Sequence, residues 1–180
     1  MKLIKQIFSI IIIISISSCS NSGKKANLIS FKDPVEYNNY IVDIQRDVAM
    51  KLLFFGETMG NSEDGEFIKN EGYKLLKHIN KKISELKRLD KFRGESYLKD
   101  AAIEQLMFYR SVVINEYREL VEIIIETNEM ADELDDDKYD EYAQRLVKTL
   151  ENLDRKEAIL DDKILQIQIR FANENYMELQ

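Results

Sequence analysis

Apolar side chains recur every three or four positions from residue 33 almost to the end of the chain, which is the period of an α-helix. The only proline, Pro34, directly follows Asp33, and this pair is typical of a helix N-terminus. Four of the six glycines gather at two breaks, residues 56–65 and residue 94. Because no segment alternates apolar and polar residues as a strand would, the sequence predicts an all-α fold.

The breaks divide this region into four predicted helices, over about residues 34–59, 66–93, 97–134 and 139–176. The last two would each be roughly 57 Å long at about 1.5 Å per residue. Short connections make consecutive helices antiparallel neighbours, so we expect an elongated, antiparallel up-down four-helix bundle over residues 33–180. The apolar stripe of its last helix comprises Tyr142, Ala143, Leu146, Val147, Leu150, Leu153, Leu160, Ile164, Leu165 and Phe171.

The N-terminal residues predict where in the cell this domain is located. Lys2 and Lys5 accompany a short apolar run, residues 3–16, and the only cysteine follows in Ile16-Ser17-Ser18-Cys19. This segment resembles the lipobox of bacterial lipoproteins, which implies a cleaved signal peptide over residues 1–18 and acyl chains such as palmitate on Cys19. Residues 19–32 would then be a flexible tether. The alternative is an uncleaved signal-anchor helix, although the run is short for a membrane span.

Several classes of function are disfavoured by composition. Cleavage would remove two lysines and no acid, taking the formal charge from −7 to −9, which disfavours nucleic acid as a partner. A single cysteine excludes a disulfide within the chain. With one histidine, His78, and no glycine-rich phosphate loop, we expect neither an enzyme nor a cofactor site. The acidic run at residues 132–137 predicts a solvated turn that caps the last helix, with a calcium site as the alternative.

Four charged residues are predicted to share one layer in the middle of the bundle. If the last two helices turn back around residues 134–139, Glu116 and Glu157 lie at one height on the apolar seam, and Asp161 lies one turn farther on. Lys51 falls near the same level. Two acids in an apolar seam do not both ionise cheaply without a cation. We therefore expect a polar layer that fixes register, in which Lys51 is the partner of the acids. The alternatives are a metal site or a pocket for a polar or cationic ligand; no metal is assigned.

A resemblance to one family covers most of the region after the tether. It rests on the opening residues 33–42 (DPVEYNNYIV) with Gln45, and on residues 98–125, which contain Phe108-Tyr109 and Glu116-Tyr117. These segments resemble an uncharacterised family of helical surface lipoproteins of spirochaetes and Bacteroidetes. The resemblance implies a helical fold and placement at the surface or in the periplasm, and it carries over no catalytic residue.

These observations together predict a lipid-anchored interaction module of the cell envelope. We expect a membrane attachment through the lipid and a protein partner in the envelope or on a host. Ser20 follows the cysteine where an aspartate would favour inner-membrane retention in lipoproteins of this kind, so we expect the outer membrane. The alternative function is binding of a small ligand or cation by the layer of Lys51, Glu116, Glu157 and Asp161.

Overall fold

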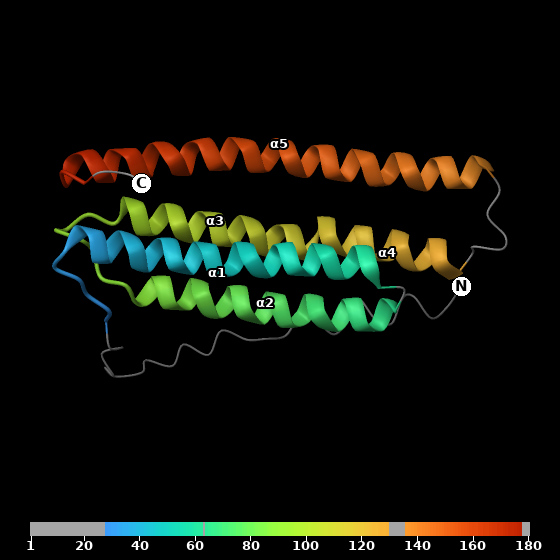
Figure 1. The fold of residues 1–180 in the computed structure, drawn as a ribbon, viewed down its shortest axis with the longest axis horizontal. Coiled ribbons are helices and arrows are strands. Elements are labelled where there is room, and N and C mark those ends of the chain that lie inside the picture. Colours follow the sequence, from blue (N-terminus) through green and yellow to red (C-terminus); the bar gives the residue numbers. More distant parts are fainter. Residues whose placement is uncertain (1–27, 63, 130–135, 178–180) are drawn as a thin grey trace, which may run out of the picture.

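Five α-helices make up the fold in the computed structural model, which describes residues 28–62, 64–129 and 136–177. Helices α1 and α2 form an antiparallel pair, and α3 and α4 follow one another in the same direction (Figure 1). The long helix α5 returns antiparallel to them. The bounds are α1 Pro34–Asn61, α2 Gly65–Arg88, α3 Tyr97–Ile114, α4 Glu116–Glu129 and α5 Asp136–Glu174. The predicted all-α, elongated, antiparallel up-down four-helix bundle is confirmed, with α3 and α4 together in the place of one helix.

The first helix begins where the sequence predicts. The carboxylate of Asp33 accepts hydrogen bonds from the backbone N–H groups of Val35, at 2.7 Å, and Glu36, at 3.0 Å. Pro34 takes the first helical position, where no N–H is needed. Asp64 begins α2 in the same way, by accepting from the N–H of Phe67 at 3.0 Å. Hydrogen bonds from backbone N–H groups to these two aspartates therefore determine where α1 and α2 begin.

The second helix ends five residues earlier than predicted, because the chain before α1 pairs with its end. The N–H of Ile29 donates to the carbonyl of Arg88 at 2.9 Å, and the N–H of Asp90 donates to the carbonyl of Ile29 at 2.7 Å. Leu89 is buried at this junction. Ile29 and Phe31 also pack against the main core, so the last part of the predicted tether belongs to the folded domain.

The predicted third helix is interrupted at Asn115, which separates α3 from α4. Its backbone torsions, φ −106° and ψ −71°, depart from the helical values, while its side-chain amide donates to the hydroxyl of Ser111 at 3.0 Å. The hydrogen bonds from the N–H of Asn115 to Ser111 and from the N–H of Glu119 to Asn115 keep the two helices in line. Most of the acidic run, residues 132–135, lies outside the described residues.

The apolar core is built mainly by α1, α2, α3 and α4, and α5 lies on one side of it. Helix α5 packs along α3 and α4, and has no extensive contact with α1 or α2 in the described parts of the chain. At one end the bundle is closed, since the ring of Phe171 lies 5.7 Å from that of Tyr37. Away from this end α1 and α5 are separated, and the bundle is open between them.

The expectation that the whole apolar stripe of the last helix is buried is therefore wrong. Leu153, Leu160, Ile164 and Phe171 are buried against α3 and α4 or the closed end. Leu150 and Leu165, which turn away from that seam, remain 41% and 50% exposed. A helix that packs on one neighbour buries a single narrow stripe, whereas the sequence carries apolar residues over a wider face.

Candidate functional site

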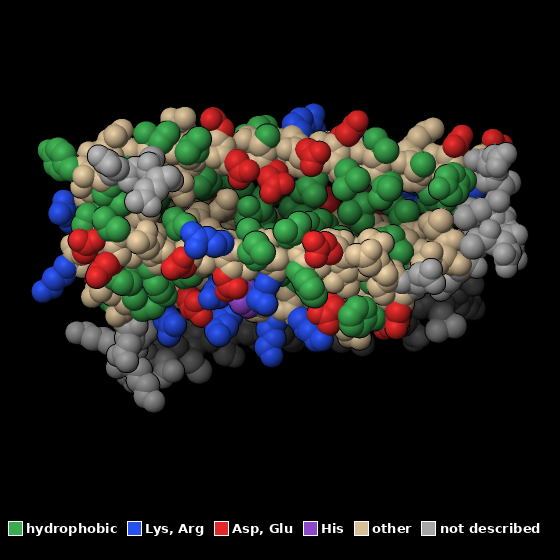
Figure 2. Space-filling view, viewed as in Figure 1, with side chains coloured by type: hydrophobic (Ala, Val, Ile, Leu, Met, Phe, Trp, Pro, Cys, Tyr) green, Lys and Arg blue, Asp and Glu red, His purple; other side chains and the backbone are tan. Residues whose placement is uncertain are grey.

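The open side of the bundle forms a groove between α1 and α5, with α3 as its floor. Its deepest part holds a pocket of about 300 Å³. The lining residues come from three helices: Val42, Gln45, Arg46 and Ala49 of α1, Gln105 and Tyr109 of α3, and Asp161, Ile164, Leu165 and Gln168 of α5. Figure 2 shows hydrophobic side chains along the hollow below α5, with acidic side chains on the α5 side. We call this feature the α1/α5 groove.

Toward the beginning of α5, the helical period places Val147 and Leu150 on the same face of α5 as the pocket residue Leu165. They are 52% and 41% exposed. At the same levels α1 carries Gly56 and Gly60, and no atom of another element lies within 4 Å of the place that a Cβ would occupy on either. Because these two positions of α1 carry no side chain and face open space, another backbone can approach α1 closely here.

A chain of hydrogen bonds crosses the floor of the groove. The side-chain amide of Gln45 donates to the carbonyl oxygen of Gln105 at 2.7 Å, and the amide of Gln105 donates to the hydroxyl of Tyr109 at 3.3 Å. Gln105 is only 8% exposed, so these bonds offset the cost of burying its amide. The sequence analysis missed this network, although Gln105 lies three residues after Ala102 on the stripe of α3 and Gln45 lies beside Ile44.

Two carboxylates, Glu157 and Asp161, act on Tyr109 of this network, and Asp154 lies about one turn before Glu157 on α5. Glu157, Asp161 and Asp154 each make no ion pair with another described residue. Burial first, and then the negative charges of Asp161 and Asp154, raises the pKa of Glu157 above its ordinary value. Burial, followed by the charges of Asp161 and Glu157, likewise raises the pKa of Tyr109 to about 12. The groove is thus a site of uncompensated negative charge beside apolar surface.

Glu116 has a different environment from Glu157. Its carboxylate accepts from the ammonium of Lys156 at 2.7 Å, which places Glu116 at the predicted height beside residues 156 and 157. The side chain is 14% exposed, and its second oxygen is buried without a hydrogen-bond partner. The cation next to this layer is therefore Lys156 of α5, where the sequence analysis expected Lys51.

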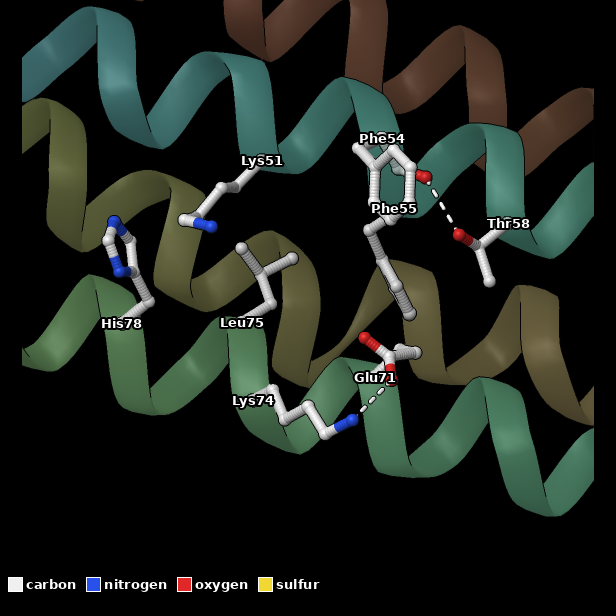
Figure 3. A pocket seen from close by; sticks show the side chains of 8 residues that line it. All are labelled: Lys51, Phe54, Phe55, Thr58, Glu71, Lys74, Leu75 and His78. Carbon is white, nitrogen blue, oxygen red and sulfur yellow. Dashed lines mark hydrogen bonds and ion pairs between the residues drawn. The ribbon is translucent and has the colours of Figure 1, made fainter.

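Lys51 lies on another side of α1, in a pocket of about 250 Å³ between α1 and α2. Figure 3 shows it extending from α1 toward the space beside Leu75 and His78 of α2. His78 itself contacts Asp47, with 3.0 Å between Nε2 and the carboxylate oxygen. The structure thus places Asp161 in the lining of the groove and Glu157 about one turn before it, where the groove meets the seam between α5 and α3/α4. Glu116 lies on that seam, and Lys51 is separated from all three.

A third cavity, of about 470 Å³, lies between α2 and α4. Its lining is mostly apolar and includes Phe55, Leu76, Val113, Tyr117 and Val121, with Lys69 and Arg118 also present. Gly72 is buried here, because a Cβ would lie 3.3 Å from the ring of Phe55. Each of the two cations already pairs with a glutamate of its own helix, so no unpaired charge marks this cavity.

No three His, Cys, Asp or Glu side chains converge in a geometry that would hold a metal ion, within residues 28–62, 64–129 and 136–177. His78 pairs with Asp47, whose carboxylate also pairs with Lys82. Cys19 and its neighbours lie outside the described residues. No described helix is both long enough and apolar enough to span a membrane.

Comparisons with protein-family models, with curated proteins and with solved structures found no match to this chain. The function must therefore be argued from the residues of the groove and from the sequence.

Proposed function

We propose that the chain is a lipid-anchored, non-enzymatic interaction module of the bacterial cell envelope, which binds a protein partner in the α1/α5 groove. The observation that carries the proposal is the open side of the bundle. Apolar residues of α5 and α1 remain exposed on this side, among them Leu165, which lines the groove. Contiguous exposed apolar surface with a polar rim is typical of a protein-binding site.

The anchor is the second part of the proposal, and it rests on the sequence around Cys19. More than one acyl chain would hold the domain durably at a membrane, because a single chain binds only marginally. We expect a bacterium that expresses the full chain to incorporate a palmitate analogue into it. Cys19→Ser should abolish the label, and labelling that persists in this variant would contradict lipidation at Cys19.

Photo-crosslinking in the envelope tests the groove. A photoreactive amino acid at Leu165, which is 50% exposed and lines the groove, should give a crosslinked protein of constant size. The same amino acid at Ile159, which is 69% exposed on another side of α5, is the matched control. Filling the groove with Ala49→Trp should abolish the product from Leu165. Equal crosslinking from both positions would contradict a partner site in the groove.

A second candidate function is the binding of a small polar ligand or cation by Glu157 and Asp161. Their missing ion pairs and the raised pKa of Glu157 favour it, because a bound cation would relieve the repulsion. Calorimetry of the full chain with divalent cations tests this candidate. Glu116→Leu separates the roles of the two glutamates. If Glu116→Leu raises the stability and leaves the heat of cation binding unchanged, Glu116 has a structural role. If the wild type itself gives no heat with divalent cations, cation binding is contradicted.

A further inference from the structure

The α1/α5 groove combines three properties that together specify the chemistry of an occupant. The helices on its two sides, α1 and α5, are straight and have nearly parallel axes (Figure 1), so a groove between them is linear. From Gln168 to Val147 the α5 side covers 22 residues, or about 33 Å at 1.5 Å per residue, which is the length of a helix of about 20 residues. A strand or a small molecule would use only part of this surface, whereas a helix matches its shape.

The second property is the apolar character of both sides. Leu165 of α5 and Ala49 of α1 line the groove, and both are exposed. The helical period places the exposed Leu150 and Leu53 on the same faces of α5 and α1. Helices pack 8–10 Å apart when the side chains at the contact are small. The open space beside Gly56 and Gly60 allows such an approach along the farther half of the groove. An occupying helix must therefore have an apolar face.

The third property is unpaired negative charge. Asp154, Glu157 and Asp161 lie at successive turns of α5, and none has a cation among the described residues. The one cation in the lining, Arg46, already pairs with Asp43 at 3.4 Å. On the opposite flank of α5 the charges are neutralised, since Lys156 and Lys163 pair with Glu116 and Glu104. The acids on this side of α5 thus leave a net negative charge beside the groove, which favours a positively charged occupant.

We propose, on the basis of the proposed function, that the partner inserts a basic amphipathic helix into the α1/α5 groove. Its apolar face contacts Leu150, Leu165 and Ala49, and its lysines or arginines pair with Asp154, Glu157 and Asp161. This is the helix-in-groove mode of recognition, in which apolar anchors supply affinity and charges select the partner. A second copy of this acidic chain is the less suitable occupant, because its own groove-facing charges have the same sign.

Synthetic helices test this inference on the lipidated full chain in a nonionic detergent. The probe is a fluorescent 20-residue peptide of leucine and lysine with one apolar face, and fluorescence anisotropy measures its binding. Two further peptides provide the comparison: one has the same composition in scrambled order, and one has glutamate in place of lysine. The amphipathic basic peptide should bind at least tenfold more tightly than either. Its affinity should also fall with added salt, since charge pairs at a surface are screened.

Two triple variants with the same change in charge separate the groove from the rest of α5. Asp154→Asn with Glu157→Gln and Asp161→Asn should weaken binding of the basic peptide at least tenfold. The control, Asp137→Asn with Glu141→Gln and Asp162→Asn, removes three exposed acids that the helical period places away from the groove, and it should change binding less than twofold. Circular dichroism of each variant establishes that the helices are retained.

Three results would overturn the inference. The first is equal weakening by the two triple variants, and the second is binding of the acidic peptide as tight as that of the basic one. The third is a different occupant: a dimer in light scattering that Ala49→Trp dissociates assigns the groove to a second copy, and a crosslink from Leu165 to residues 20–27 of the same chain assigns it to the tether. If the peptides fail while envelope crosslinking at Leu165 succeeds, only the basic character of the partner is refuted.

Discussion

Replacing Glu157 by leucine should make the domain more stable and should weaken binding in the groove. Glu157 lies between Leu153 and Leu160 on the seam where α5 packs against α3 and α4, and both leucines are buried. The glutamate is itself partly buried, and it has no cation among the described residues. Leucine at this position would continue the apolar seam and would remove the repulsion from Asp161 and Asp154.

The size of the effect follows from the burial. A fully buried leucine contributes about 1.5–3 kcal/mol relative to an exposed one, so a partly buried position should give about 1–2 kcal/mol. For a domain of this size, about 1 kcal/mol corresponds to roughly 2–4 °C in the melting temperature. Thermal unfolding followed by circular dichroism should therefore show a rise of several degrees at pH 7.5. Asp162→Leu, on an exposed side of α5, is the control and should give no comparable rise.

The dependence on pH isolates the contribution of the charge. Because the pKa of Glu157 is raised in the folded chain, this carboxyl ionises at a lower pH in the unfolded chain than in the folded chain. The resulting loss of stability is absent below the ordinary pKa of 4.5 and complete above the raised pKa. Glu157→Gln should thus stabilise the domain at pH 7.5 and have little effect at pH 4. A lower melting temperature for Glu157→Leu than for the wild type would refute the conclusion that this carboxylate is unpaired.

Three further variants test the packing and the helix start. Tyr37→Phe removes a buried hydroxyl without a hydrogen-bond partner, so it should leave stability unchanged or raise it by about 1 kcal/mol in urea unfolding, and a large loss would reveal a missed partner. Gly72→Leu should destabilise the domain by about 1–3 kcal/mol because the new side chain meets the ring of Phe55, whereas Gly72→Ala should be nearly neutral. Asp33→Ala should cost about 1 kcal/mol by removing two hydrogen bonds at the start of α1, and Asp33→Asn should restore most of it.

The sequence by itself determined the helices, their order and most of their core-facing residues. The reason is local: Asp33 and Pro34 cap α1 through their own side chains, and the 3.6-residue period places Ile41, Ile44 and Val48 on one face whatever lies opposite. The position of Glu116 level with residues 156 and 157 was also predicted from residue numbers alone, since antiparallel helices joined by a short turn have a fixed register. The anchor at Cys19 remains a prediction from sequence.

The candidate site depended on tertiary structure. An apolar period shows which residues favour burial, and it does not show which helix covers them. The sequence therefore predicts Leu150 and Leu165 as core residues, although α5 packs mainly on α3 and α4. The lateral displacement of α5 also determined which cation pairs with Glu116, because Lys156 is on its seam and Lys51 faces α2. An apolar face of a helix is buried where another helix packs on it and lines a groove where none does. Only the arrangement of the helices in space shows which of the two occurs.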